Sequence, residues 1–342
     1  MHLTRNQAVL TGVCAALAFV LAGCLEREET ITVDSDGRVH IRAEFETDSF
    51  DELYMGDAMP ALEGGWIVSE SVEKDAQGEE TFRLEAEAAF APGVELPFSF
   101  ASALQADPDV MLQFPTSVSI ERRPDGWYYH FSRRYPGRPW AFHERARQQF
   151  QEQMKKLGDR SLEEMSAAER TRVVRLLAEL ETAKYEALAR RAFKEVLDDA
   201  PQDAWLHARA ALMRVLQELD GEHIVDLMSK PADDVNEQAL EKEAEAFENR
   251  TIEAMQHALR REAGISIGRV NAFVRRFNWE KRYYEITEDL GDDAFTIRVG
   301  MPGQVVGHNG ARVEHGMVVW EFSGTMLRDN ELELMVTSRL TE

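Results

Sequence analysis

Apolar positions between Glu29 and Arg138 recur mostly at every second residue, and turn residues interrupt them at short intervals. This alternation predicts strands with one buried and one exposed face. Asp36-Gly37, Gln77-Gly78 and Pro124-Asp125-Gly126 are turn sequences of the kind that connect paired strands. We therefore expect three hairpins, which span about 31–45, 65–89 and 117–134.

At Pro139 the apolar spacing changes to that of a helix, and it keeps this period until about Gly264. Ser166 and Glu169 have capping-box spacing and predict a long helix that ends near Pro201. Two further helices are expected at about 202–219 and 234–263, and a helical stretch at about 267–279. The two-residue period then returns, with strands expected at about 284–287, 294–301, 317–322 and 332–338.

Strands at both ends of the chain with helices between them predict an α+β fold. The simplest architecture is an antiparallel sheet built from N- and C-terminal hairpins with a large helical insertion, because isolated hairpins are unstable. Two separate sheet domains joined by a helical linker are the alternative. The expected regions are a signal peptide (1–23), an N-terminal sheet region (24–139), a helical insertion or arm (140–264), and C-terminal helix and strands (265–342).

Residues 1–23 have the pattern of an export signal, with a mostly apolar run from Ala8 to Leu21. The segment Leu21-Ala22-Gly23-Cys24 resembles the lipobox of bacterial lipoproteins. That resemblance implies cleavage before Cys24 and a bilayer anchor of acyl chains on this residue. Leu25, rather than aspartate, after the cysteine favours the periplasmic face of the outer membrane over the inner membrane. An ordinary secretory peptide that contains a cysteine is the alternative.

A second resemblance covers about a third of the chain. Met301-Pro302-Gly303-Gln304-Val305-Val306, Asn309-Gly310 and Val318-Val319-Trp320-Glu321-Phe322, with the opening hairpin, are similar to extracytoplasmic lipoprotein domains of the LppM type. The helical insertion at about 140–264 departs from the compact form of that family. The resemblance implies a fold and a cell-envelope setting, and it supplies no active site.

Composition and charge narrow the function classes. The chain is 44% hydrophobic and 30% charged, as folded globular proteins are. Its 342 residues include 62 Asp and Glu against 39 Lys and Arg, and the formal net charge of −23 argues against nucleic acid as a partner. Cys14 lies in the expected signal, so an acylated Cys24 leaves no thiol for a disulfide or a zinc cluster.

No cofactor, metal or catalytic residue is expected. The nine histidines include no pair at the spacing of a helical metal site, and no Gly-rich phosphate loop follows a strand. His308 is interpreted as a polar turn residue, and Asp34-Ser35-Asp36-Gly37 as a hairpin turn rather than a calcium loop. Four carboxylates fit a solvated acidic loop better than an acid/base pair: Glu285, Asp289, Asp292 and Asp293.

The third hairpin concentrates aromatic and basic residues in an otherwise acidic chain. The candidates for contact with lipid headgroups or a partner are Arg122, Arg123, Trp127, Tyr129, Arg133 and Arg134. Basic and amphipathic aromatic side chains suit an anionic membrane surface. The competing interpretation, which we favour, is that one aromatic face is core and that the arginines pair with the Glu-rich helices.

Together these patterns predict a non-enzymatic lipoprotein that acts as a binding or scaffolding module of the cell envelope. Its partners would be the bilayer, through acylated Cys24, and a protein, through the helical insertion. A helical bundle that packs only against its own sheet is the alternative for the insertion. An envelope hydrolase with a site assembled from distant carboxylates and histidines is one alternative. A carrier for an apolar ligand is another.

Overall fold

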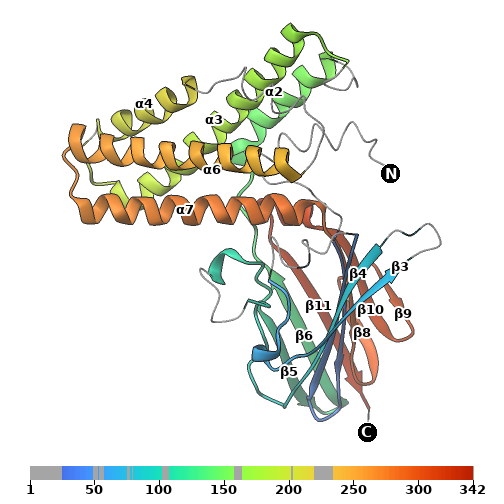
Figure 1. Cartoon of the computed structure of the whole chain (residues 1–342). Helices are drawn as coiled ribbons and strands as arrows, with labels where there is room; N and C mark the ends of the chain where they lie inside the picture. Colours follow the sequence, from blue (N-terminus) through green and yellow to red (C-terminus); the bar gives the residue numbers. More distant parts are fainter. Residues whose placement is uncertain are drawn as a thin grey trace. The chain divides into compact units, whose positions relative to one another are not determined.

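The computed structural model shows an α+β protein, as the sequence predicts (Figure 1). Its described residues form two compact units, a helical unit within 140–285 and a sheet unit from both flanking segments. The described residues are 25–48, 53, 58–74, 78, 80–101, 108–157, 164–201, 203–218 and 234–341. The expected signal peptide and Cys24 lie outside them.

The larger sheet of the sheet unit has seven strands, which come from both the N-terminal and the C-terminal part of the chain. In order of pairing these are β3 (Ile67–Lys74), β4 (Glu80–Phe90), β2 (Val39–Thr47), β1 (Glu26–Val33), β7 (Ala294–Gly300), β10 (Met317–Ser323) and β9 (Arg312–Glu314). β1 and β2 form the hairpin that the Asp36-Gly37 turn predicts. β1 also pairs with β7, and this pairing is parallel, from Glu26 with Ala294 onward.

The smaller sheet has four antiparallel strands. They are β5 (Thr116–Arg123), β6 (Gly126–Tyr135), β11 (Leu332–Leu340) and β8 (Gln304–His308). The expected hairpin at 117–134 is therefore present, but β11 joins it in a second sheet. The sequence predicts one antiparallel sheet; the structure instead has two, because only hairpin partners are specified locally and the remaining pairings join distant segments.

The two sheets pack face to face (Figure 1). Aromatic rings fill the space between them. Tyr135 of β6 lies 5.5 Å from Phe322 and 6.3 Å from Phe295, measured between ring centroids. Phe114 and Phe100 continue this row of rings, with centroids 4.7 Å apart. Side chains of this size account for much of the apolar area that the sheets remove from water.

The helical unit contains α2 (Ala141–Leu157), α3 (Ala167–Leu197), α4 (Ala204–Gln217), α6 (Asp234–His257) and all but the last four residues of α7 (Ile267–Asp289). The capping box at Ser166 and Glu169 is present at the start of α3. A π-helical turn, Ala258–Glu262, follows α6. The strand expected at 284–287 is wrong, because α7 continues through these residues. Phe273, Phe277 and Tyr284 are buried with α3 and α4 residues in a single core cluster, which favours the continued helix.

Candidate functional site

The first described residue, Leu25, directly follows the expected lipidated cysteine. Leu25 is 4% exposed, and its carbonyl oxygen accepts a hydrogen bond of 3.1 Å from the backbone N–H of Ala294. From Glu26 onward, β1 is paired with β2 on one side and β7 on the other. The chain therefore belongs to an interior strand of the larger sheet from the residue after Cys24.

Two ion pairs lie buried beneath β1. Nη2 of Arg27 lies 2.6 Å from Oδ2 of Asp293, and the two side chains are 2% and 5% exposed. Nη1 of Arg133 lies 2.7 Å from Oε2 of Glu29, while Nε of Arg133 donates to Oγ1 of Thr116 at 2.9 Å. Each buried charge thus has an opposite charge beside it, as burial away from water requires.

Arg133 and its neighbour Tyr135 both have pKa values above their ordinary ones. Burial lowers the pKa of Arg133, but the charge of Glu29 and contact with Tyr135 more than offset this and raise it above its ordinary value. Burial raises the pKa of Tyr135 to about 12, although Arg133 acts in the opposite direction. Both groups therefore keep one protonation state across the physiological pH range.

These contacts decide the position of two sequence candidates. Arg133 is 0% exposed, and Tyr129 is 2% exposed and donates from its hydroxyl to the carbonyl of Ser35 at 2.8 Å. Neither side chain is at the surface, so neither offers a contact to lipid or to a partner. The interpretation that one aromatic face of this hairpin is core fits Tyr129 and Phe131.

Three of the remaining candidates, Arg122, Arg123 and Trp127, belong to the hairpin tip, which we define as Arg122 to Tyr128. The guanidinium of Arg122 lies 5.2 Å from the ring centroid of Trp127, and that of Arg123 lies 4.4 Å from Tyr128. Arg123 also forms an ion pair of 2.6 Å with Glu121. Arg134, further along β6, lies 3.7 Å from Glu331.

Carboxylates offset part of the basic charge at the hairpin tip. Oδ2 of Asp125 accepts from the hydroxyl of Tyr128 at 2.7 Å and from Arg339 at 3.1 Å. The hydrogen bond from Tyr128, followed by that from Arg339, lowers the pKa of Asp125. The expectation that the arginines pair with helical glutamates is wrong for Arg123, Arg133 and Arg134, whose carboxylate partners belong to the sheet unit.

The sequence does not predict that Glu121, Asp125 and Arg339 form ion pairs and hydrogen bonds at the hairpin tip. The only available signal was cross-strand position, since Glu121 and Arg339 both stand opposite Tyr128 in the register. Reading that signal requires the pairing of β6 with β11, which joins segments about two hundred residues apart.

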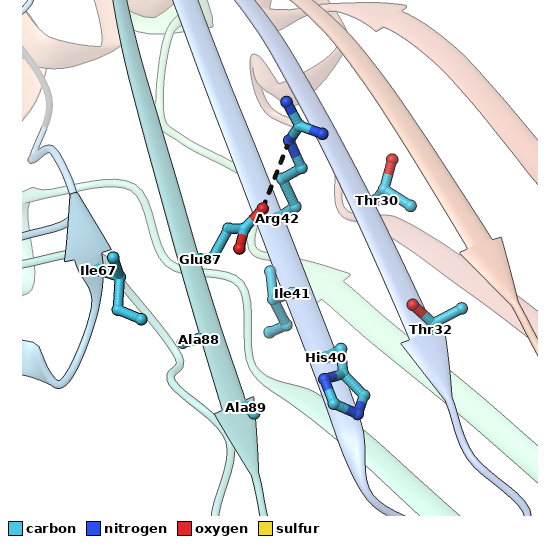
Figure 2. A pocket seen from close by; sticks show the side chains of 9 residues that line it. All are labelled: Thr30, Thr32, His40, Ile41, Arg42, Ile67, Glu87, Ala88 and Ala89. Atoms are coloured by element: carbon cyan, nitrogen blue, oxygen red, sulfur yellow. Dashed lines mark ion pairs between the residues drawn. The ribbon is translucent and has the colours of Figure 1, made fainter. Parts of the chain in front are cut away.

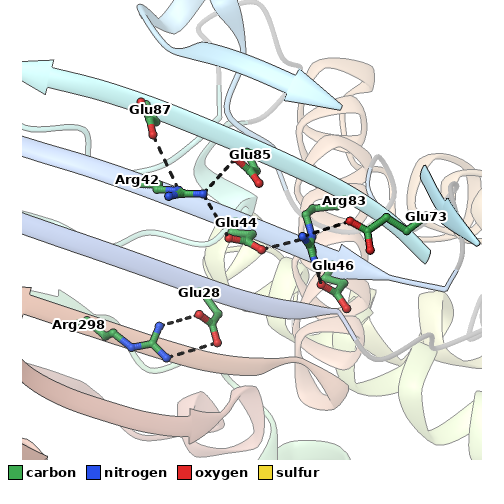
Figure 3. A network of polar contacts seen from close by, with 9 residues as sticks. All are labelled: Glu28, Arg42, Glu44, Glu46, Glu73, Arg83, Glu85, Glu87 and Arg298. Atoms are coloured by element: carbon green, nitrogen blue, oxygen red, sulfur yellow. Dashed lines mark hydrogen bonds and ion pairs between the residues drawn. The ribbon is translucent and has the colours of Figure 1, made fainter. Parts of the chain in front are cut away.

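The outer face of the seven-stranded sheet has a network of ion pairs (Figure 3). Arg42 of β2 lies 3.1 Å from Glu85 and 3.8 Å from Glu87 on β4. Arg83 lies 2.6 Å from Glu46, and Arg298 of β7 lies 2.6 Å from Glu28. The network contains three arginines and six glutamates: Arg42, Arg83, Arg298, Glu28, Glu44, Glu46, Glu73, Glu85 and Glu87. The face is therefore acidic although its arginines are paired.

A pocket of about 360 Å³ opens on the same face (Figure 2). Thr30 and Thr32 of β1 and His40 of β2 line it, with Ile67 of β3 at its edge. Nε2 of His40 lies 3.1 Å from Asp34, and Arg42 is engaged by the glutamates of the network. Its lining offers no activated nucleophile with a base and an orienting group, so it does not have the geometry of a catalytic site.

The expectation of a solvated acidic loop is wrong for Glu285, which belongs to the helix α7, and for Asp293, which is 4% exposed. Asp293 is buried against Arg27 in the sheet unit, while Glu285 of the helical unit lies 3.6 Å from Lys281. Oδ1 of Asp36 accepts from the backbone N–H of Arg38 at 2.9 Å, and φ of Gly37 is 89°, so the hairpin interpretation of Asp36-Gly37 is confirmed. Within the described residues, no group of three histidine, cysteine, aspartate or glutamate side chains is arranged to hold a metal ion.

The helical unit has a polar cluster inside its core. Nδ1 of His143 lies 2.8 Å from the hydroxyl of Tyr284, and Nζ of Lys184 lies 3.0 Å from Oε1 of Glu181. His143 and Lys184 are each 3% exposed. Burial, assisted by the charges of Lys184 and Arg147, lowers the pKa of His143 to about 4. His143 is therefore neutral at physiological pH.

Comparisons with known proteins add little to this geometry. No protein-family model matches the chain, and a search of curated proteins finds no match. Among solved structures, the NMR structure of the folded domain of Mycobacterium tuberculosis LppM aligns over 94% of each chain, with 10% sequence identity and a TM-score of 0.29. The likeness is weak, and at this TM-score it decides neither fold nor function. None of the helices in the described residues is both long and apolar enough to cross a membrane.

Proposed function

We propose that this protein is a lipid-anchored protein of the bacterial cell envelope that works as a non-enzymatic binding or scaffolding module. The observation that supports the anchor is that the folded sheet begins directly after the lipobox-like sequence. This sequence ends at Cys24, and the next residue, Leu25, is hydrogen-bonded to Ala294 in the sheet. Two or more acyl chains on one cysteine hold a protein stably at a bilayer, whereas one chain does not.

The proposal includes a location in the cell envelope and a protein partner. Leu25 after the cysteine favours the periplasmic face of the outer membrane. The helical unit is the proposed contact for a protein partner, because Leu206 on α4 and Ile267 on α7 are 62% and 54% exposed. Exposed apolar side chains are available for burial in a protein interface, whose core is more apolar than the rest of the surface.

Mass spectrometry of the purified full-length product tests the anchor. We expect the mature chain to begin at Cys24 and to be heavier than its residues by the mass of the acyl chains. Cys24→Ser should keep residues 1–23 and have no added lipid, because the acylated thiol is gone. Cys14→Ser is the matched control, since Cys14 lies in the expected signal and its loss should leave processing unchanged. A wild-type product with residues 1–23 intact and a free Cys24 thiol would overturn the proposal.

A further inference from the structure

An anchor on Cys24 would be attached to the sheet unit without a linker. Consecutive Cα atoms are ~3.8 Å apart, so the acylated residue lies one residue from Leu25. Leu25 itself is buried and hydrogen-bonded to Ala294, and β1 is paired on both sides from Glu26. An anchor of this kind restricts the orientation of the sheet unit at the bilayer as well as its location.

The register identifies what else lies at the Leu25 end of the sheet unit. Glu26 is opposite Ala294 of β7, and Ala294 is opposite Ser323 of β10. The chain then enters the short 3-10 helix Gly324–Leu327, in which Met326 is 51% exposed. A flexible apolar side chain is therefore displayed at the same end as the expected acyl chains.

The hairpin tip lies at the other end of the sheet unit. Tyr129 of β6 contacts Ser35, in the turn after β1, while Tyr135 lies near Phe295, at the start of β7. β6 thus runs from the turn end of β1 toward the Leu25 end. The eight residues of β1 separate the two ends by about 25 Å at ~3.3 Å a residue.

The acidic network argues against the seven-stranded sheet lying flat on a membrane. Its outer face presents six glutamates against three arginines, and anionic headgroups would repel this excess of negative charge. An upright sheet unit keeps this face in solvent.

We propose that the sheet unit stands on the bilayer by its Leu25 end, with Met326 at the lipid surface and the hairpin tip facing away from it. This inference rests on the proposed anchor at Cys24. The separation of about 25 Å exceeds the Debye length of about 8 Å at physiological ionic strength. The arginines of the tip therefore do not bind the headgroups of the membrane that holds the anchor.

Site-specific fluorescence on the full-length, processed protein tests the orientation. An acylated Cys24 leaves no natural thiol in the mature chain, so a dye reacts only at an introduced cysteine. The two positions are Met326→Cys, at the Leu25 end, and Pro124→Cys, in the exposed turn of the tip. The labelled proteins are reconstituted in vesicles of phosphatidylcholine and phosphatidylglycerol that contain a lipid-attached quencher.

We expect the dye at position 326 to be quenched several-fold more strongly than the dye at position 124. Flotation of the same vesicles reports anchoring independently. Failure to float would contradict the anchor itself. Flotation with equal quenching at both positions, stronger quenching at position 124, or no quenching at position 326 would leave the anchor intact and overturn the upright orientation.

Discussion

Arg133 and Arg134 are adjacent in β6 but lie on opposite faces of the smaller sheet, and this difference allows a matched test. Arg133 is 0% exposed beside Glu29, whereas the side chain of Arg134 is 54% exposed. Removing one member of a buried pair leaves an uncompensated charge, which costs about 3–5 kcal/mol. A surface ion pair contributes only ~0–1 kcal/mol.

We therefore expect Arg133→Met to lower the free energy of unfolding by about 3–5 kcal/mol, and Arg134→Met by less than about 1 kcal/mol. Urea denaturation followed by circular dichroism measures both. Similar losses of stability for the two variants would show that Glu29 does not need Arg133 to compensate its charge.

The same buried charges limited sequence prediction at the residue scale. On β1, Arg27 and Glu29 point inward with Ile31 and Val33, so the strand begins before the apolar alternation does. Their partners, Asp293 and Arg133, are far away in the sequence. The sequence alone therefore favours a surface position for Arg133, because a charged residue is buried only when it is paired and the pair is visible only in three dimensions.

At the scale of elements, local sequence signals predict most helices and hairpins. They do not predict which strands pair when those strands are far apart in the sequence. Turn residues correctly predict the β1–β2 and β5–β6 hairpins, but not the parallel pairing of β1 with β7. In α7, Glu280 is 3% exposed and pairs with Arg191 and Arg276. Because Glu280 occupies a buried position of α7, the apolar spacing typical of a helix is interrupted there. The sequence after Glu280 therefore indicates a strand rather than a continued helix.

The start of α3 gives a test of one such local signal. Oγ of Ser166 accepts from the backbone N–H of Glu169, and Oε2 of Glu169 accepts from the backbone N–H of Ser166 at 2.8 Å. Ser166→Ala removes this cap and should lower the free energy of unfolding by about 1 kcal/mol. Thr171→Ala, one turn into the same helix, should be neutral or slightly stabilising because alanine has the higher helix propensity.

Thermal and urea denaturation measure the change in the free energy of unfolding for each of the two variants. A loss of stability from Thr171→Ala as large as that from Ser166→Ala would mean that the cap has no special contribution. Retention of the Ser166 effect in a Glu169→Gln background is also expected, since the hydroxyl would still accept from the same backbone N–H.

At the scale of the whole molecule, acid should destabilise the helical unit through His143. The charged and titratable groups acting on His143 are Lys184, Arg147 and Glu144, and the hydroxyl of Tyr284 lies against its ring. The pKa of His143 is about 4 in the folded protein and about 6.5 in an unfolded chain. Between these values the unfolded chain binds a proton that native His143 does not bind. The stability contributed by neutral His143 is therefore complete above pH 6.5 and falls as the pH drops toward 4.

At pH 5 this linkage should lower the free energy of opening the helical unit by about 2 kcal/mol relative to pH 7. Hydrogen exchange of α3 peptides, corrected for the intrinsic rate at each pH, measures it. His143→Gln should remove most of the difference, because glutamine does not titrate. His40→Gln, on the exposed face of β2, is the control and should leave the exchange of α3 unchanged. If α3 showed the same pH dependence in His143→Gln as in the wild type, another group would be responsible for the acid sensitivity of the helical unit.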